Sequence, residues 1–174
     1  INPKFEVKEN ASIQMNGDNL IGVRAIGGRI YDGSTYHWGE GIHLHSDGVF
    51  RWSYNEGKIQ MLGDNSIAVF LKGVVGFRNG NFTINNGAIG VNKNSVGIYA
   101  VYEDEDFEDI YLNLKMGNLR PEIYNNGYIV IGKNSTGMYL YTKYYNTKLE
   151  FSNYDLRSSI QSGEENATGM AFNI

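Results

Sequence analysis

Residues 85–100 run Asn-Asn-Gly-Ala-Ile-Gly-Val-Asn-Lys-Asn-Ser-Val-Gly-Ile-Tyr-Ala, and residues 125–140 run Asn-Asn-Gly-Tyr-Ile-Val-Ile-Gly-Lys-Asn-Ser-Thr-Gly-Met-Tyr-Leu. A second pair of matching stretches, Ile-Gln-Met-x-Gly-Asp-Asn, occurs at 13–19 and again at 59–65, and a weaker copy covers 166–172. Self-similarity of this kind predicts a stacked repeat protein, in which each unit buries its apolar face against its neighbours.

Every copy places a turn asparagine three positions before a small residue, and a strand follows. The turn asparagines are Asn19, Asn65, Asn94, Asn134 and Asn166. The small residues are Gly22, Ala68, Gly97, Gly137 and Gly169. Then come an inward column (Val23, Val69, Ile98, Met138, Met170), an outward column (Arg24, Phe70, Tyr99, Tyr139, Ala171) and a second inward column (Ala25, Leu71, Ala100, Leu140, Phe172). This period of two predicts strands with one buried face.

The spacing of the turn asparagines indicates the architecture. A coil of roughly 20–30 residues with two or three short strands is typical of a parallel β-helix. The wide interval between Asn19 and Asn65 has room for an unmarked coil at 41–44, Gly-Ile-His-Leu. We therefore expect an all-β protein, a right-handed single-stranded parallel β-helix of about six coils with loop insertions, in one unit over residues 1–174.

The repeat resembles the passenger repeats of large fusobacterial-type autotransporter adhesins, most closely at 85–100 and 125–140. The resemblance implies a fragment of a longer passenger domain that reaches the bacterial surface by type V secretion. It also implies outer-membrane anchoring through a C-terminal barrel that this sequence does not contain. The implied function is a rigid, monomeric scaffold that mediates or supports binding to glycans or proteins of host or bacterial surfaces.

A second resemblance leaves an alternative open. Ala88-Ile89-Gly90 followed by residues 94–98, Asn-Ser-Val-Gly-Ile, is similar to the head repeats of trimeric autotransporter adhesins. Those heads imply a left-handed β-roll built from three chains. Their repeat is much shorter than the intervals between the turn asparagines here, so the spacing favours the monomeric β-helix.

Composition and charge narrow the range of partners. The chain is 41% hydrophobic, has 22 glycines and no cysteine, and carries a net charge of -4. The absence of cysteine excludes disulfides and thiolate metal sites within this sequence. Dispersed basic residues on an acidic chain argue against a nucleic-acid partner. No apolar run is long enough for a membrane-spanning helix, and a chain that begins at Ile1 without a leader is interpreted as an excised fragment or a mature product.

The densest charge run, residues 103–109, is acidic and falls in a long interval of the repeat. We interpret it as a solvated loop. A weak calcium site there stays open as an alternative, although the run lacks the spacing of a preformed calcium loop. We expect no cofactor.

The histidines and tryptophans suggest where a ligand would bind. His43 and His45 should lie side by side on an outer face and could ligate a metal, but paired surface histidines usually bind none, so we predict no metal. Aromatic rings on an irregular part of a rigid scaffold are better candidates for recognition of a glycan or a protein. The predicted binding residues are Tyr36, Trp38, His43, His45, Trp52 and Tyr54.

Catalysis is the less favoured alternative. A polysaccharide-acting β-helix enzyme would need two or three carboxylates from adjacent coils, about 5–10 Å apart. The aligned outward column contains no carboxylate, and nucleophile-elbow, phosphate-loop and zinc-protease motifs are absent from the sequence. The prediction is a binding or structural protein and not an enzyme.

Overall fold

The computed structural model describes residues 6–26, 29–31, 36–38, 53–74, 76–80, 87–103, 122–143, 150–153 and 158–173. Within these ranges all regular structure is β-strand, and no helix occurs. Three sheets of five strands each dominate the molecule, and a small two-stranded sheet accompanies them. The all-β prediction is therefore confirmed for the described part of the chain.

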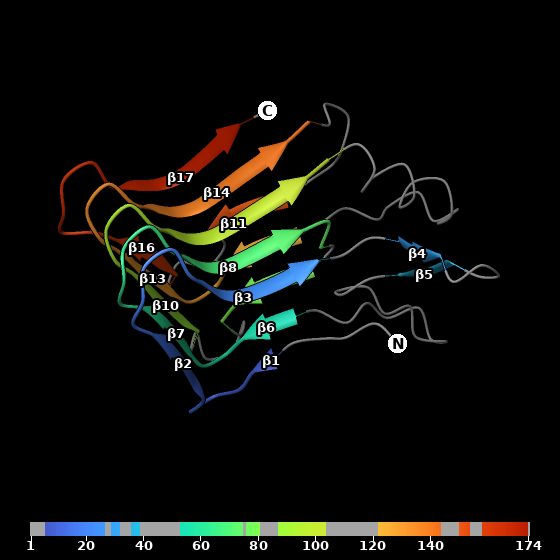
Figure 1. Ribbon diagram of the computed structural model, residues 1–174, viewed down its shortest axis with the longest axis horizontal. Coiled ribbons are helices and arrows are strands. Elements are labelled where there is room, and N and C mark those ends of the chain that lie inside the picture. Colours follow the sequence, from blue (N-terminus) through green and yellow to red (C-terminus); the bar gives the residue numbers. More distant parts are fainter. Residues whose placement is uncertain are drawn as a thin grey trace.

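The chain visits the three large sheets in turn, as Figure 1 allows the reader to follow. Sheet A contains β1 (Glu6–Val7), β6 (Ser53–Asn55), β9 (Gly76–Asn79), β12 (Glu122–Asn125) and β15 (Glu150–Asn153). Sheet B contains β2 (Ser12–Met15), β7 (Lys58–Met61), β10 (Ala88–Val91), β13 (Tyr128–Ile131) and β16 (Ser159–Gln161). Sheet C contains β3 (Ile21–Ile26), β8 (Ile67–Lys72), β11 (Val96–Tyr102), β14 (Thr136–Thr142) and β17 (Thr168–Asn173).

We call three successive strands, one in each sheet, a rung. Every strand in these sheets pairs in parallel with its counterparts in the adjacent rungs. Figure 1 shows sheet C in front as a stack from β3 to β17, with sheet B behind it. Parallel strands joined through other sheets, and not through hairpins, are consistent with a β-solenoid.

Strand register agrees with the columns aligned from the sequence. In sheet C, Val23, Val69, Ile98, Met138 and Met170 occupy one column, and Ala25, Leu71, Ala100, Leu140 and Phe172 another. In sheet B one column consists entirely of isoleucine: Ile13, Ile59, Ile89, Ile129 and Ile160. The predicted alignment of the sheet C columns is confirmed.

Inward columns of all three sheets form one hydrophobic core. Sheet B contributes Ile59 and Ile129, and sheet C contributes Ile98 and Met138, all without exposed surface. Sheet A adds Phe77 and Ile123, which are equally buried. Stacked β-branched and aliphatic side chains suit this interior because they pack well against like neighbours on a pleated surface.

The small-residue column of sheet C reflects a close approach between rungs. A Cβ on Gly97 would lie 2.5 Å from the carbonyl oxygen of Gly137, and a Cβ on Gly137 would lie 2.7 Å from that of Gly169. Atoms cannot approach so closely, so the two glycines allow the backbones to meet.

One part of the sequence prediction needs correction. β2 pairs directly with β7, and β3 with β8, so no rung fits between them at the expected extra coil. β4 (Arg29–Tyr31) and β5 (Tyr36–Trp38), which follow β3, instead pair as an antiparallel ribbon. Residues 41–44 themselves lie outside the described ranges.

Among the described residues, no helix has the length and apolar character needed to cross a membrane.

Candidate functional site

The corner between sheets B and C is built on the turn asparagines. Asn19, Asn65, Asn94, Asn134 and Asn166 have φ values of 60°, 55°, 53°, 55° and 55°. This left-handed conformation is disfavoured for most residues, and asparagine tolerates it better than other side chains that carry a Cβ. The repeated asparagine therefore sets the direction in which the chain leaves sheet B.

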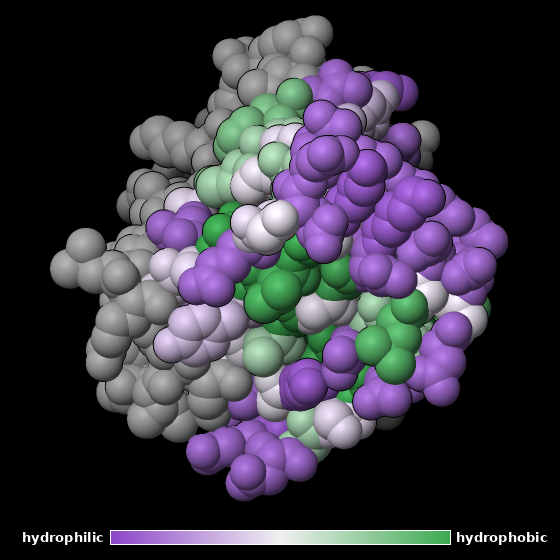
Figure 2. Space-filling model, turned by 90° about the vertical axis from the view of Figure 1, so that its left-hand side faces the viewer, coloured by the Kyte–Doolittle hydropathy of each residue, from purple (hydrophilic) through white to green (hydrophobic). Residues whose placement is uncertain are grey.

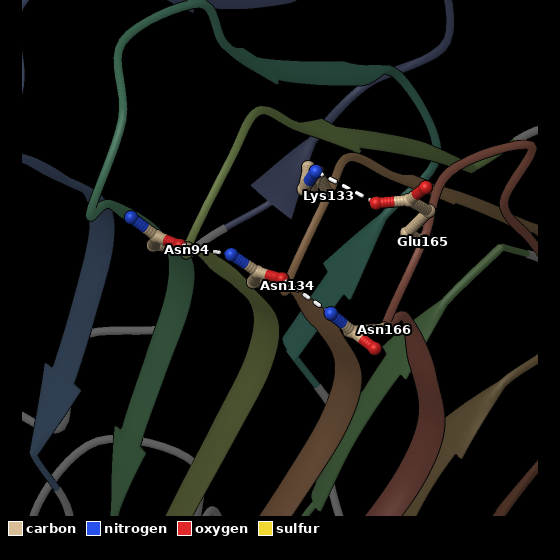
Figure 3. Close-up of polar contacts among 5 residues, drawn as sticks. All are labelled: Asn94, Lys133, Asn134, Glu165 and Asn166. Carbon is tan, nitrogen blue, oxygen red and sulfur yellow. Dashed lines mark hydrogen bonds and ion pairs between the residues drawn. The ribbon is translucent and has the colours of Figure 1, made fainter.

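The side chains of Asn65, Asn94, Asn134 and Asn166 form an outer ladder along the surface. Figure 3 shows its last three members. The Nδ2 of Asn94 donates to Oδ1 of Asn65 at 3.2 Å, Asn134 donates to Asn94 at 3.1 Å, and Asn166 donates to Asn134 at 3.2 Å. An ion pair between Lys133 and Glu165, 2.8 Å long and exposed, lies beside the ladder. The outer ladder connects successive rungs at their most exposed corner.

A serine follows three of these asparagines and adds a second connection just inside. The backbone N–H of Ser66 donates to Oγ of Ser95 at 3.0 Å, and that of Ser95 donates to Oγ of Ser135 at 3.0 Å. Each of the three serines is almost fully buried. Their hydroxyl groups satisfy backbone N–H groups that would otherwise be buried without a partner.

The corner between sheets A and B contains an inner asparagine ladder that the sequence analysis missed. Nδ2 of Asn55 donates to Oδ1 of Asn79, Asn79 donates to Asn125, and Asn125 donates to Asn153, each at 2.7 Å. The first three are fully buried. Each Nδ2 group also donates to a backbone carbonyl, such as that of Ala88 for Asn55, so buried amides are paired with both side chain and backbone.

The inner ladder begins at Asn55 because the aligned residue of the preceding rung cannot join it. Val7 occupies the aligned position in β1 and has no side-chain donor. Oδ1 of Asn55 is buried and accepts no hydrogen bond from any residue that the structure describes.

The two ladders run in opposite directions along the stack. Side chains of the outer ladder donate toward earlier rungs, and those of the inner ladder donate toward later rungs. Their amide dipoles therefore oppose one another along the stack.

Aromatic rings occupy the outer face of sheet C. The rings of Phe70 and Tyr99 meet edge to face with centroids 5.6 Å apart, and those of Tyr99 and Tyr139 meet likewise at 5.0 Å. Arg24 extends the column, with Cζ 5.9 Å from the centroid of Phe70. Burial, and then repulsion from Tyr139 and Tyr141, raise the pKa of the Tyr99 hydroxyl above its ordinary value. Edge-to-face contacts of this kind stabilise the stack.

An ion pair marks the end of the same face. Nζ of Lys72 lies 2.6 Å from Oε2 of Glu103. The hydrogen bond from Lys72 and its positive charge lower the pKa of the Glu103 carboxyl. Glu103 is the first residue of the acidic run, and residues 104–109 lie outside the described ranges, as does any calcium site there.

The outer face of sheet B contains a groove, and we take it as the candidate binding site. Gly90 lies between Gln60 and Val130 in one outward column, and Ala88 lies between Lys58 and Tyr128 in the other. Two small residues on β10 thus sit between longer side chains on β7 and β13. The resulting groove has a volume of about 440 Å³.

The groove is lined by apolar walls and a few polar groups. Leu62 and Val130 line it and are 43% and 55% exposed. Gln60, Asn92 and Lys58 contribute two carboxamides and one ammonium group. Asn92 is held in place because its Nδ2 donates to the carbonyl oxygen of Leu62 at 3.0 Å. A mostly apolar surface with a few fixed polar groups is the usual composition of a small-ligand site.

Figure 2 views the side of the molecule on which the strands of sheet B and the B–C corners lie. Hydrophobic residues gather in the middle of this face, and hydrophilic residues lie to the right of them and below them in the view. A group of exposed apolar residues marks a binding surface more reliably than single exposed apolar residues do.

The predicted binding residues are not brought together by any described contact. The backbones of Tyr36 and Trp38 belong to β5 of the small antiparallel ribbon, and the backbone of Tyr54 belongs to β6 in sheet A. Their side chains lie outside the described part, as do His43, His45 and Trp52 entirely. The predicted aromatic patch therefore stays a prediction.

Among the described residues, no group of three or more His, Cys, Asp or Glu side chains is arranged to hold a metal ion. Comparison with protein-family models, with curated proteins and with solved structures finds no match.

Proposed function

We propose that this chain is a surface-exposed adhesin segment, a right-handed parallel β-helix that holds a binding surface away from the cell. The observation that carries the proposal is the stack of three parallel sheets whose corners are connected by continuous side-chain ladders. Right-handed crossover is the strong preference of parallel strands that join through a connection, which supports the handedness. Each rung contributes one turn.

Such a stack is suited to adhesion for physical reasons. Hydrogen bonds between rungs satisfy the backbone of the described strands, so the stack stays rigid without a thick globular core. The outer faces of sheets B and C remain available for contact, and both expose aromatic or aliphatic side chains. Rigid presentation lowers the ordering cost of binding.

The proposal includes the partner and the location implied by the resemblance to autotransporter passengers. The chain acts as a monomer at the bacterial surface after type V secretion and contacts glycans or proteins of host or bacterial surfaces. It is neither an enzyme nor a nucleic-acid-binding protein, and it needs no cofactor. The interval between turn asparagines supports a single-chain helix over the interlocked trimeric head.

Adhesion of coated beads tests this proposal. Beads carrying the purified chain and beads carrying a Trp38→Ala/Trp52→Ala double variant are applied to epithelial cells and to bacteria. We expect the chain to cause adherence and the double variant to adhere less if the predicted aromatic residues contribute. Circular dichroism confirms that both proteins are folded, and antibodies against the chain should label intact source cells. Absence of adherence by the folded chain on every surface would refute the adhesive role.

A further inference from the structure

Gly90 occupies a position where the fold gains nothing from a glycine. A Cβ added there would meet only Cγ of Gln60, at 3.7 Å, which is ordinary van der Waals contact. Its φ is not positive, unlike those of Gly73 and Gly80. By contrast, a Cβ on Gly97 would be 2.5 Å from a backbone oxygen of the next rung. A glycine inside a strand weakens the strand, and one without a packing reason marks a place where something else approaches the backbone.

The groove above Gly90 is the space that a side chain would fill. β-Strands in a sheet lie about 4.8 Å apart, so the walls on β7 and β13 are separated by two strand spacings, or roughly 10 Å. One row of ring-shaped groups fits between such walls, and a folded partner does not. A volume of about 440 Å³ is likewise in the range of small-ligand sites.

Charge in the groove favours an anion. Lys58 is the charged residue of the lining and is exposed. Its ammonium group makes no ion pair or hydrogen bond with any described residue, unlike Lys72 and Lys133, which pair with Glu103 and Glu165. Gln60 and Asn92 provide amide groups suited to hydroxyls, and Leu62 and Val130 provide apolar surface suited to the C–H face of a sugar ring.

We propose that the groove over Ala88 and Gly90 binds a sugar residue that carries a carboxylate, as a terminal or internal unit of an acidic glycan. The ring lies against the backbone of β10 between Gln60 and Val130, and Lys58 pairs with the carboxylate. This site deepens the proposed adhesive function and rests on it for its biological meaning, although the binding itself is measured independently.

A matched pair of ligands tests the site by NMR. Methyl glucuronoside and methyl glucoside differ only in that the glucuronoside has a carboxylate where the glucoside has a hydroxymethyl group. Each sugar is titrated into ¹⁵N-labelled protein. We expect amide shifts to gather on β7, β10 and β13, with tighter binding of the glucuronoside and a preference that weakens with added salt. Shifts that fall elsewhere, or equal binding of the two sugars, would overturn the proposal.

Substitutions distinguish loss of the groove from loss of the fold. Gly90→Val fills the groove and should abolish the shifts, whereas Gly169→Val, at a strand glycine whose Cβ would meet nothing within 4 Å, should leave them unchanged. Lys58→Gln should reduce affinity for the glucuronoside roughly two- to fivefold, as expected for an exposed charge, with no change for the glucoside. Lys143→Gln, at the exposed residue directly after β14, is its control. Undiminished binding by Gly90→Val would place the sugar elsewhere.

The bead assay distinguishes failure of the site from failure of the adhesive function. If beads coated with Gly90→Val adhere as well as the natural chain and the sugars cause no shifts, the groove proposal fails and adhesion stands. If the sugars bind at β10 but no coated bead adheres to any surface, the groove stands and adhesion fails.

Discussion

At the scale of single residues, asparagine performs two different tasks in this protein. In the outer ladder, Asn94 and Asn134 accept a left-handed backbone and exchange exposed hydrogen bonds of 3.1–3.2 Å. In the inner ladder, Asn79 and Asn125 are fully buried and bond at 2.7 Å. Substitutions should therefore have different costs in the two ladders.

The inner ladder should show a position effect. Asn79 bonds the side chains of both Asn55 and Asn125, so Asn79→Ala leaves two buried amides short of a partner and should lower the free energy of unfolding by about 2–4 kcal/mol. Asn55 has one such side-chain neighbour, and Asn55→Ala should cost about 1–2 kcal/mol. Urea unfolding measures both, and a cost for Asn55→Ala that equals or exceeds that for Asn79→Ala would contradict the ladder.

Substitutions of Asn134 should measure the cost of the left-handed backbone conformation in the outer ladder. Asn134→Gly and Asn134→Ala both lose the hydrogen bonds to Asn94 and Asn166, but only alanine must hold a Cβ at φ 55°. We expect the alanine variant to be less stable than the glycine variant by about 1 kcal/mol in thermal unfolding. Equal stability of the two variants would show that the turn does not need the left-handed conformation.

At the scale of elements, sheets B and C could be predicted from the sequence and sheet A could not. The turn asparagine lies between a strand of sheet B and a strand of sheet C at nearly constant distance, so aligning it aligns both strands. Sheet A strands are joined to the others by connections of variable length, and the inner asparagines are 24, 46 and 28 residues apart. The constant spacing made it possible to align the strands of sheets B and C from the sequence, and the strands of sheet A lack such a spacing.

A misleading sequence match also kept the inner ladder from being predicted. Asn85-Asn86-Gly87 has the same sequence as residues 125–127, which invites alignment of Asn85 with Asn125. The structure pairs Asn125 with Asn79 instead. The available signal was an apolar residue two positions before asparagine, in Phe77-Arg78-Asn79, residues 123–125 and residues 151–153. The groove was missed because it appears only when Gln60, Gly90 and Val130 are placed side by side with their exposures known.

Two glycines of adjacent elements should respond oppositely to alanine. Gly97→Ala places a Cβ against the Gly137 carbonyl and should destabilise the protein by about 1–3 kcal/mol. Gly90→Ala has open space and should stabilise it by about 0.5–1 kcal/mol. Thermal unfolding of the two variants checks the contrast, and a loss of stability in Gly90→Ala would mean that the fold itself requires this glycine.

The tyrosine column of sheet C should make the protein sensitive to alkali. Burial and neighbouring tyrosines raise the pKa of Tyr99 in the folded state above its ordinary value of 10.0. Stability from this group is complete below the unfolded pKa and is lost as pH rises through the folded pKa. Tyr99→Phe keeps the ring and removes the proton, so the variant should lose less stability than the natural chain above pH 10. Urea midpoints against pH measure this, and identical profiles would contradict it.

At the scale of the whole molecule, the three five-stranded sheets are built from rungs that each contact their immediate neighbours. Ladders at two corners, the aromatic column on sheet C and the groove on sheet B all exist because rungs stack in register. The groove in particular needs three adjacent rungs, since β7 and β13 form its walls and β10 its floor. A shift by one rung or by one residue would remove the site.

The distance between residues in distant rungs tests this stacking most directly. The chain has no cysteine, so spin labels can be attached uniquely at Gln14→Cys and Gln161→Cys, which occupy one outward column of sheet B. Four strand spacings predict a narrow distribution at a backbone separation of about 19 Å in double electron–electron resonance. A broad distribution, or a separation one strand spacing longer, would contradict the described stack and the groove built upon it.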